Sequence, residues 1–115
     1  MYKIYLISTT YPDGTYYKIG RTKRDPIKRL KELKTANSQE LNLVSFFESK
    51  WGPRIEVNLH RKFKQYKCEG EWFKLPKSEA AKFIECCQHN HDIFTLLEKN
   101  NTWFNQSKKF SKYLS

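Results

Sequence analysis

The chain has 115 residues, of which 38% are hydrophobic and 16% aromatic, a composition that can fill the core of one domain and excludes the disordered class. Its 22 Lys+Arg against 12 Asp+Glu give a formal net charge of +10, which favours a polyanionic partner. No apolar run reaches the ~18 residues of a membrane helix, and residues 1–8 are too short and polar for a signal peptide. We therefore expect an intracellular protein that has no membrane partner.

The cysteines Cys68, Cys86 and Cys87 are odd in number, and two of them are adjacent. They lack the paired spacing of a zinc site, so the sequence predicts reduced thiols, with neither a structural zinc nor a disulfide. His89 and His91 follow the cysteine pair, and we interpret them as exposed polar residues at a helix break.

The N-terminal residues predict an antiparallel hairpin. Residues 2–8 are β-branched and aromatic, which is typical of a buried strand. Pro12-Asp13-Gly14 supplies a tight turn, and residues 16–20 return as a second strand.

A basic helix follows the hairpin. Asp25 and Pro26 suit its first turn, Ile27, Leu30 and Leu33 repeat at helical spacing, and residues 37–38 end it. Residues 1–37 hold nine basic and three acidic side chains, and the surplus is concentrated between residues 18 and 34. On charge alone, a solvated lysine-rich face and a phosphate-binding face are equally good interpretations. The candidate nucleic-acid-binding residues are Arg21, Lys23, Arg24, Lys28, Lys31 and Lys34.

Downstream, residues 41–49 predict a third strand, and Gly52-Pro53 begins a helix with Ile55, Leu59 and Phe63 as its buried stripe. Residues 70–75 are a short strand or loop. A further helix starts near Ser78, uses Ala80, Phe83, Ile84 and Cys87, and restarts near Asp92 with Ile93, Phe94 and Leu97.

These elements predict an α+β fold, with a small central antiparallel β-sheet of about three strands flanked by helices, in β-β-α-β-α order with C-terminal helices. We expect one domain over residues 1–99 and a tail over residues 100–115. The tail interleaves Trp103, Phe104, Phe110 and Tyr113 with lysines, a composition that suits either docking on the domain or base stacking on nucleic acid.

The order of these elements coincides with a set of spaced motifs. Lys3-Ile4-Tyr5 and Lys18-Ile19-Gly20 lie on the two hairpin strands, Arg29-Leu30 lies on the first helix, and Glu56 on the next. Together with Glu56 to His60 and Gly70-Glu-Trp-Phe73, this pattern over residues 2–76 resembles the GIY-YIG nuclease superfamily. The similarity is greatest to the branch named after an open reading frame of phage T5.

The resemblance implies a metal-dependent endonuclease that hydrolyses DNA. Glu56 would bind one Mg²⁺ (or Mn²⁺), Arg29 would clamp the phosphate, and Tyr5 would position or deprotonate the attacking water. His60 lies four residues after Glu56, so both share one helix face. Because a free tyrosine is a poor base at neutral pH, the role of Tyr5 as a base requires a lowered pKa.

The sequence departs from the superfamily at Lys18, where most members carry a second tyrosine. Tyr17 is one residue early and points to the opposite face of the strand, whereas Gly20 shares the face of Lys18. Many members of the superfamily carry an asparagine after the metal-binding helix, and the nearest match in this sequence is Glu71. The resemblance implies that Glu71 is either a second acidic ligand or a residue that orients His60. The departure keeps an alternative open, a non-catalytic nucleic-acid-binding module on the same fold. A basic surface that meets an acidic protein is a third, more remote interpretation.

Overall fold

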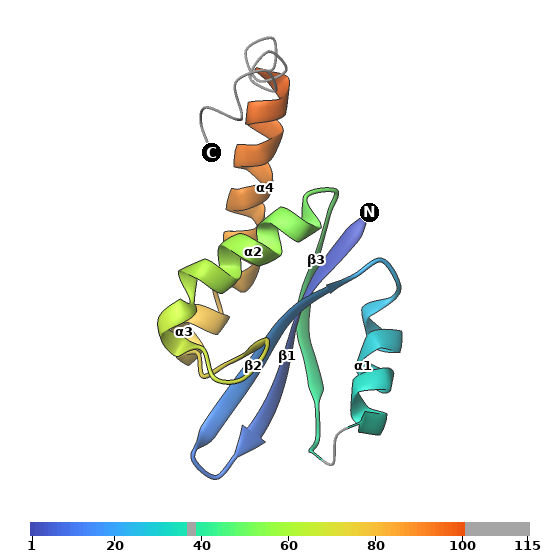
Figure 1. Ribbon diagram of the computed structural model, residues 1–115, viewed down its shortest axis with the longest axis vertical. Helices are drawn as coiled ribbons and strands as arrows, with labels where there is room; N and C mark the ends of the chain where they lie inside the picture. Colours follow the sequence, from blue (N-terminus) through green and yellow to red (C-terminus); the bar gives the residue numbers. More distant parts are fainter. Residues whose placement is uncertain (37–38, 101–115) are drawn as a thin grey trace.

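The computed structural model describes residues 1–36 and 39–100. Four strands form one antiparallel sheet in the order β3-β1-β2-β4. Figure 1 labels β1, β2 and β3 of this sheet. The strands are β1 (Tyr2–Tyr11), β2 (Gly14–Thr22), β3 (Asn42–Ser49) and β4 (Trp72–Phe73). The helices are α1 (Pro26–Ala36), α2 (Gly52–Lys62), the 3-10 turn η1 (Lys64–Tyr66), α3 (Lys77–Ala80) and α4 (Phe83–Lys99). The predicted α+β class and element order are confirmed, with β4 as a fourth strand.

The hairpin of β1 and β2 is longer than the sequence predicted. Its pairing runs from Lys3 opposite Thr22 to Tyr11 opposite Gly14. Gly14 has φ of +141°, a conformation that favours glycine, so it can close the turn without strain. The tight turn therefore fixes the register of both strands.

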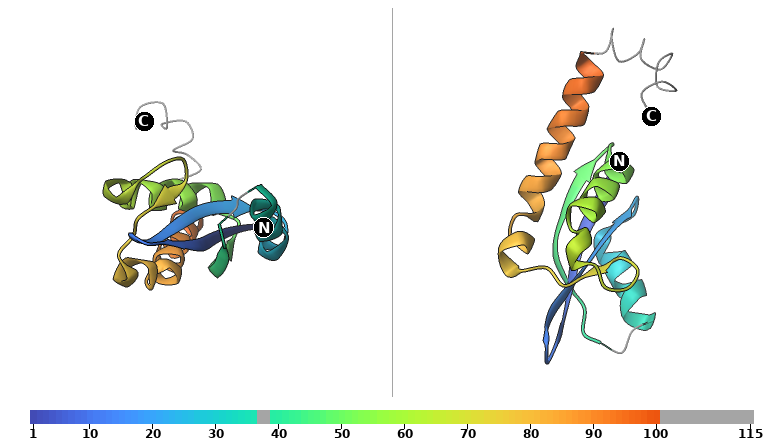
Figure 2. Two further views of the ribbon diagram at one scale, coloured as in Figure 1. Left: turned by 90° about the horizontal axis from the view of Figure 1, so that it is seen from below. Right: turned by 60° about the vertical axis from the view of Figure 1, so that its left-hand side comes forward.

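The sheet separates two apolar clusters, and alternate residues of β1 supply each of them. Ile4 and Leu6 face α2 and α4, whereas Tyr5 and Ile7 face α1. Figure 2 shows α1 apart from the group formed by α2, α3 and α4. A buried strand with apolar side chains on both faces was the prediction for this segment, and it is confirmed.

Two details of helix packing were predicted wrongly. Ile27 is 46% exposed, because α1 packs on the sheet through Leu30 and Leu33, and in its first turn the buried residue is Pro26. Ile84, Ile93 and Leu97 are also exposed, since the sheet covers only the opposite side of α4.

The expected helix break near Asp92 is absent, because α4 continues to Lys99. The chain bends earlier, at residues 81–82 between α3 and α4. The polar stretch stays helical because tertiary contacts hold it. His91 Nδ1 lies 2.7 Å from Ser49 Oγ, and Asn90 accepts a hydrogen bond from Asn58 at 2.8 Å. His91 is thus half-buried, whereas His89 is exposed as predicted.

Two sequence predictions lie outside the described residues, namely the helix end at 37–38 and the tail over 100–115 except for its first residue, Asn100. Among the described helices, none is long and apolar enough to cross a membrane. All three cysteines carry free thiols.

Candidate functional site

The candidate site forms at the outer edge of β2, next to the point where β4 begins. The pairing of β2 with β4 stops at Lys18 opposite Trp72, and Ile19 N then donates to the Glu71 carbonyl at 3.2 Å. The Ile19 carbonyl lies 2.9 Å from His60 Nε2. Side chains from α2 and from the segment before β4 therefore meet at this edge.

Three potential metal ligands converge here. One ligand atom each from Glu56, His60 and Glu71 lie within 4.8 Å of one another. The first two share a face of α2, as their four-residue spacing predicted, and the register of β4 adds Glu71 from a distant part of the chain. Two carboxylates and an imidazole are a donor set that suits a divalent cation.

Glu56 is a buried carboxylate rather than a surface carboxylate. The residue is 8% exposed, and its Oε1 accepts a hydrogen bond from Arg21 at 3.0 Å. Its Oε2 is buried and has no hydrogen-bond partner among the described residues. Burial, and then the charge of Glu71, raise the pKa of Glu56 against the lowering effect of Arg21. A buried oxygen without a partner beside two other donors fits a bound cation.

His60 is oriented by the strand backbone. Because a carbonyl oxygen only accepts, Nε2 carries a proton in its contact with Ile19, and Nδ1 is the ring nitrogen that does not take part in this contact. The ring stands edge-on to Phe73, with centroids 4.9 Å apart. Donation by the second ring nitrogen to a backbone carbonyl is typical of histidines that bind metals or transfer protons.

Tyr5 lies on the α1 side of the sheet, directly over Gly20. The two residues are cross-strand partners, and a Cβ added to Gly20 would lie 2.3 Å from the Tyr5 hydroxyl. Burial raises the pKa of Tyr5, although hydrogen bonding to Arg29 and its positive charge act in the opposite direction. The phenol is thus protonated at neutral pH, and the shift is opposite to the one that a base requires.

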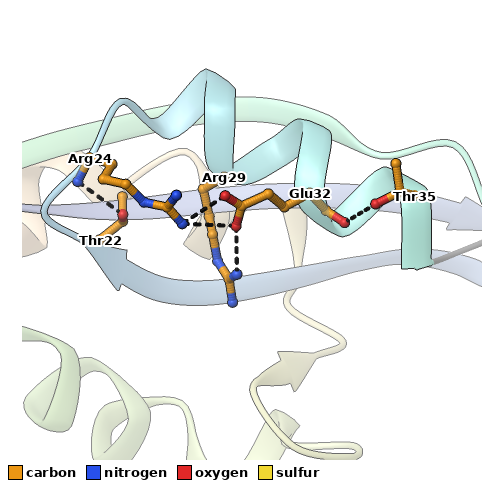
Figure 3. Close-up of polar contacts among 5 residues, drawn as sticks. All are labelled: Thr22, Arg24, Arg29, Glu32 and Thr35. Atoms are coloured by element: carbon orange, nitrogen blue, oxygen red, sulfur yellow. Dashed lines mark hydrogen bonds and ion pairs between the residues drawn. The ribbon is translucent and has the colours of Figure 1, made fainter.

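Arg29 is held by a carboxylate that the sequence analysis did not identify. Glu32 lies 3.2 Å from Arg29 Nη1 and 2.7 Å from Arg24 Nη2, between the two guanidinium groups (Figure 3). The i, i+3 spacing of Arg29 and Glu32 was the available signal. Glu32 restricts the orientation of Arg29, which also contacts Tyr5.

Lys18 occupies the same face of β2 as Gly20, as the alternation of the strand predicted. Its Nζ lies 3.1 Å from Glu71 Oε2 and 5.7 Å from the centroid of the Trp72 ring. Tyr17 is buried on the opposite face, in the cluster that contains Ile19. The structure therefore brings Lys18 to the site and leaves Tyr17 in the core.

The predicted basic residues differ in their surroundings. Arg21 and Arg24 form ion pairs with Glu56 and Glu32, and Lys23 Nζ lies 4.9 Å from the centroid of the Tyr2 ring. Lys28, Lys31 and Lys34 are exposed on α1. Arg21, Lys23 and Arg24 are exposed as well, so all six predicted basic residues lie on a surface that is open to solvent.

Comparison with known proteins places the chain. No curated protein and no solved structure matches it. The family model of the T5orf172 domain matches residues 2–88, which is more than half of the chain and includes β1 to β4, α1 and α2. The chain therefore belongs to the T5orf172 domain family, a GIY-YIG-related family.

Proposed function

We propose that this protein is a metal-dependent endonuclease that hydrolyses DNA phosphodiester bonds at the edge of β2. The observation that carries the proposal is the convergence of Glu56, His60 and Glu71 beside Tyr5 and Arg29. Glu71 and Glu56 both affect the pKa of Tyr5, so groups from the two faces of the sheet meet around its edge. Acidic ligands next to a guanidinium are the parts that phosphodiester cleavage needs.

One Mg²⁺ or Mn²⁺ would be held by the free Oε2 of Glu56 and by the carboxylate of Glu71. When bound, such an ion polarises the phosphate and stabilises the leaving oxygen. The Glu56 oxygen that accepts from Arg21 is the other one, so the arginine fixes the carboxylate and leaves Oε2 available.

The remaining side chains act on the phosphate and on the water. Arg29 offers a planar fork to two phosphate oxygens, while Glu32 and the Tyr5 hydroxyl hold its plane. We assign proton acceptance from the water to His60 Nδ1, because Nε2 is already committed to the Ile19 carbonyl. The Tyr5 phenol then serves as a hydrogen-bond donor, and Lys18 supplies positive charge.

The proposed partner is DNA. We accordingly propose that the protein is located in the compartment of the cell that contains DNA. The exposed lysines of α1 would neutralise phosphates on either side of the cleaved bond. Such contacts position the duplex but do not read its sequence, so we expect low intrinsic specificity. We regard residues 1–99 as the catalytic domain.

Supercoiled plasmid tests the proposal directly. The purified chain should nick it with Mg²⁺ or Mn²⁺, and EDTA should stop the reaction. Glu56→Gln keeps the size of the side chain, removes its charge and should abolish nicking while DNA binding persists. Nicking that survives EDTA would refute the one-ion mechanism. Binding without nicking under any divalent ion would favour the non-catalytic binding module.

A further inference from the structure

A concave feature lies on the same face of the sheet as Tyr5, apart from the candidate site. It is a cavity of about 310 Å³ at the turn end of the hairpin. Its walls include the rings of Tyr11, Tyr16 and Trp72. Tyr11 and Tyr16 meet edge to face, with centroids 5.5 Å apart, so the two rings form a corner rather than a filled stack. This space can accept another flat ring.

Strand geometry links the cavity to the candidate site. Tyr16, Lys18 and Gly20 are alternate residues of β2, so their side chains share one face of the strand. Along this face, Lys18 lies between Tyr16, which lines the cavity, and Gly20, which lies under Tyr5. At roughly 3.3 Å per residue, Tyr16 and Gly20 are about 13 Å apart along the strand. Trp72 pairs with Lys18 across the strands, so its ring separates the cavity from the site.

A lysine ammonium group lies near two of the aromatic walls. Lys18 Nζ lies 5.7 Å from the Trp72 ring centroid, and Lys74 Nζ lies 5.6 Å from that of Tyr16. Aromatic rings alternating with ammonium groups are the pattern that binds single-stranded nucleic acid, because rings stack on bases and cations neutralise phosphates. The rim adds the amide of Gln39 and the carboxylate of Glu69, which can hydrogen-bond to the edge of a base.

We propose that this cavity binds an unpaired nucleobase of the strand whose phosphate lies at Arg29 and Lys18. The inference rests on the proposed function and narrows its substrate to nucleic acid with an unpaired or extruded nucleotide beside the cleaved bond. A base inside a regular duplex is stacked and paired, so it enters such a cavity only after leaving the stack.

Fluorescence of Trp72 is the direct readout. In a chain with Trp51→Phe and Trp103→Phe, Trp72 is the single remaining tryptophan. A 15-nucleotide single strand, added in EDTA so that nothing is cleaved, should quench this fluorescence. An abasic strand with the same number of phosphates should bind at least about fivefold more weakly and leave the fluorescence unchanged, since stacking contributes ~1 kcal/mol or more per base.

Paired variants separate stacking from folding. Tyr11→Leu with Tyr16→Leu keeps apolar bulk and removes both ring faces, and it should weaken binding of the single strand at least about fivefold without affecting the abasic strand. Tyr11→Phe with Tyr16→Phe is the matched control, because it keeps the rings, and it should bind as the parent does. Thermal melting identifies any loss of fold.

The proposal is overturned if the abasic strand binds as tightly as the normal strand. It is also overturned if the Tyr11→Leu, Tyr16→Leu variant binds the normal strand as tightly as the parent does. A blunt duplex that quenches as well as the single strand would remove the requirement for an unpaired base. A free nucleoside monophosphate that binds as tightly as the strand would make the cavity a nucleotide site separate from the phosphate at Arg29. Because binding is measured in EDTA, failure of cleavage and failure of base binding are distinguishable.

Discussion

The contact between Tyr5 and Gly20 can be tested by adding one methyl group. In Gly20→Ala the new Cβ would lie 2.3 Å from the Tyr5 hydroxyl oxygen and 2.5 Å from Cζ. Ordinary contact begins at 3.4 Å, so the hydroxyl must move by about 1.1 Å, the difference between 3.4 and 2.3. The ring cannot move freely, because it is 1% exposed and packs with Ile7, Leu30 and Leu41.

The expected size of the effect follows from that displacement. Overpacking of a filled core costs about 1–3 kcal/mol of unfolding free energy. A shift of about 1 Å in a catalytic group can reduce turnover roughly 100-fold. Gly20→Ala should therefore weaken the fold moderately and reduce plasmid nicking severely.

A double-mutant cycle isolates the contact. Urea unfolding is measured for Gly20→Ala in the parent and in a Tyr5→Leu background. With the tyrosine ring removed, the added methyl group should be neutral or slightly stabilising, because alanine loses less backbone freedom than glycine in a strand. If Gly20→Ala costs the same in both backgrounds, Tyr5 does not lie over Gly20 and our account of the site geometry is wrong.

Substitutions of Glu56, Arg29 and Lys18, with Tyr5→Phe as a companion to those of Lys18, test individual side chains. Glu56→Gln should abolish the increase in melting temperature that Mn²⁺ gives the parent, because it replaces the buried carboxylate by an amide, and an unchanged increase would assign the ion elsewhere. Arg29→Lys keeps the charge but loses the planar fork, so nicking should fall far more than DNA affinity measured by anisotropy, and equal activity would reduce Arg29 to a member of the basic surface. Lys18→Met should abolish nicking, and Lys18→Arg should restore it if charge is the role. Near-parent cleavage by both Lys18→Met and Tyr5→Phe would refute this assignment of the site.

The hairpin and the α2 site residues could be predicted because local chemistry determines them. The Pro12-Asp13-Gly14 turn specifies the register of β1 and β2, and that register places Tyr5 over Gly20. Helical spacing places Glu56 and His60 on one face. Alternation along β2 separates Tyr17 from Lys18. The hairpin, the shared face of Glu56 and His60 and the separation of Tyr17 from Lys18 needed only neighbours within one element or across one turn.

Features that depend on long-range packing were harder to predict. Glu71 enters the site because a two-residue strand, Trp72–Phe73, adds to the edge of β2, and nothing local to Glu71 indicates that edge. The continuity of α4 depends on contacts with Ser49 and Asn58, which override the weak helix propensity of its polar stretch. Sequence periodicity also predicted too large a buried face for α1, because the sheet covers only part of the stripe formed by Ile27, Leu30 and Leu33.

The charge arrangement explains why a lysine suits position 18 in this chain. Two carboxylates at one edge repel each other, and β2 supplies one cation to each of them from opposite faces. Arg21 lies 3.0 Å from Glu56, and Lys18 lies 3.1 Å from Glu71. A tyrosine at position 18 would leave Glu71 without this charge partner beside the buried Glu56, which is costly in a partly desolvated site. Lys18 and Glu71 are therefore one coupled unit, and the departure from the superfamily pattern on β2 goes together with the acidic residue that precedes β4.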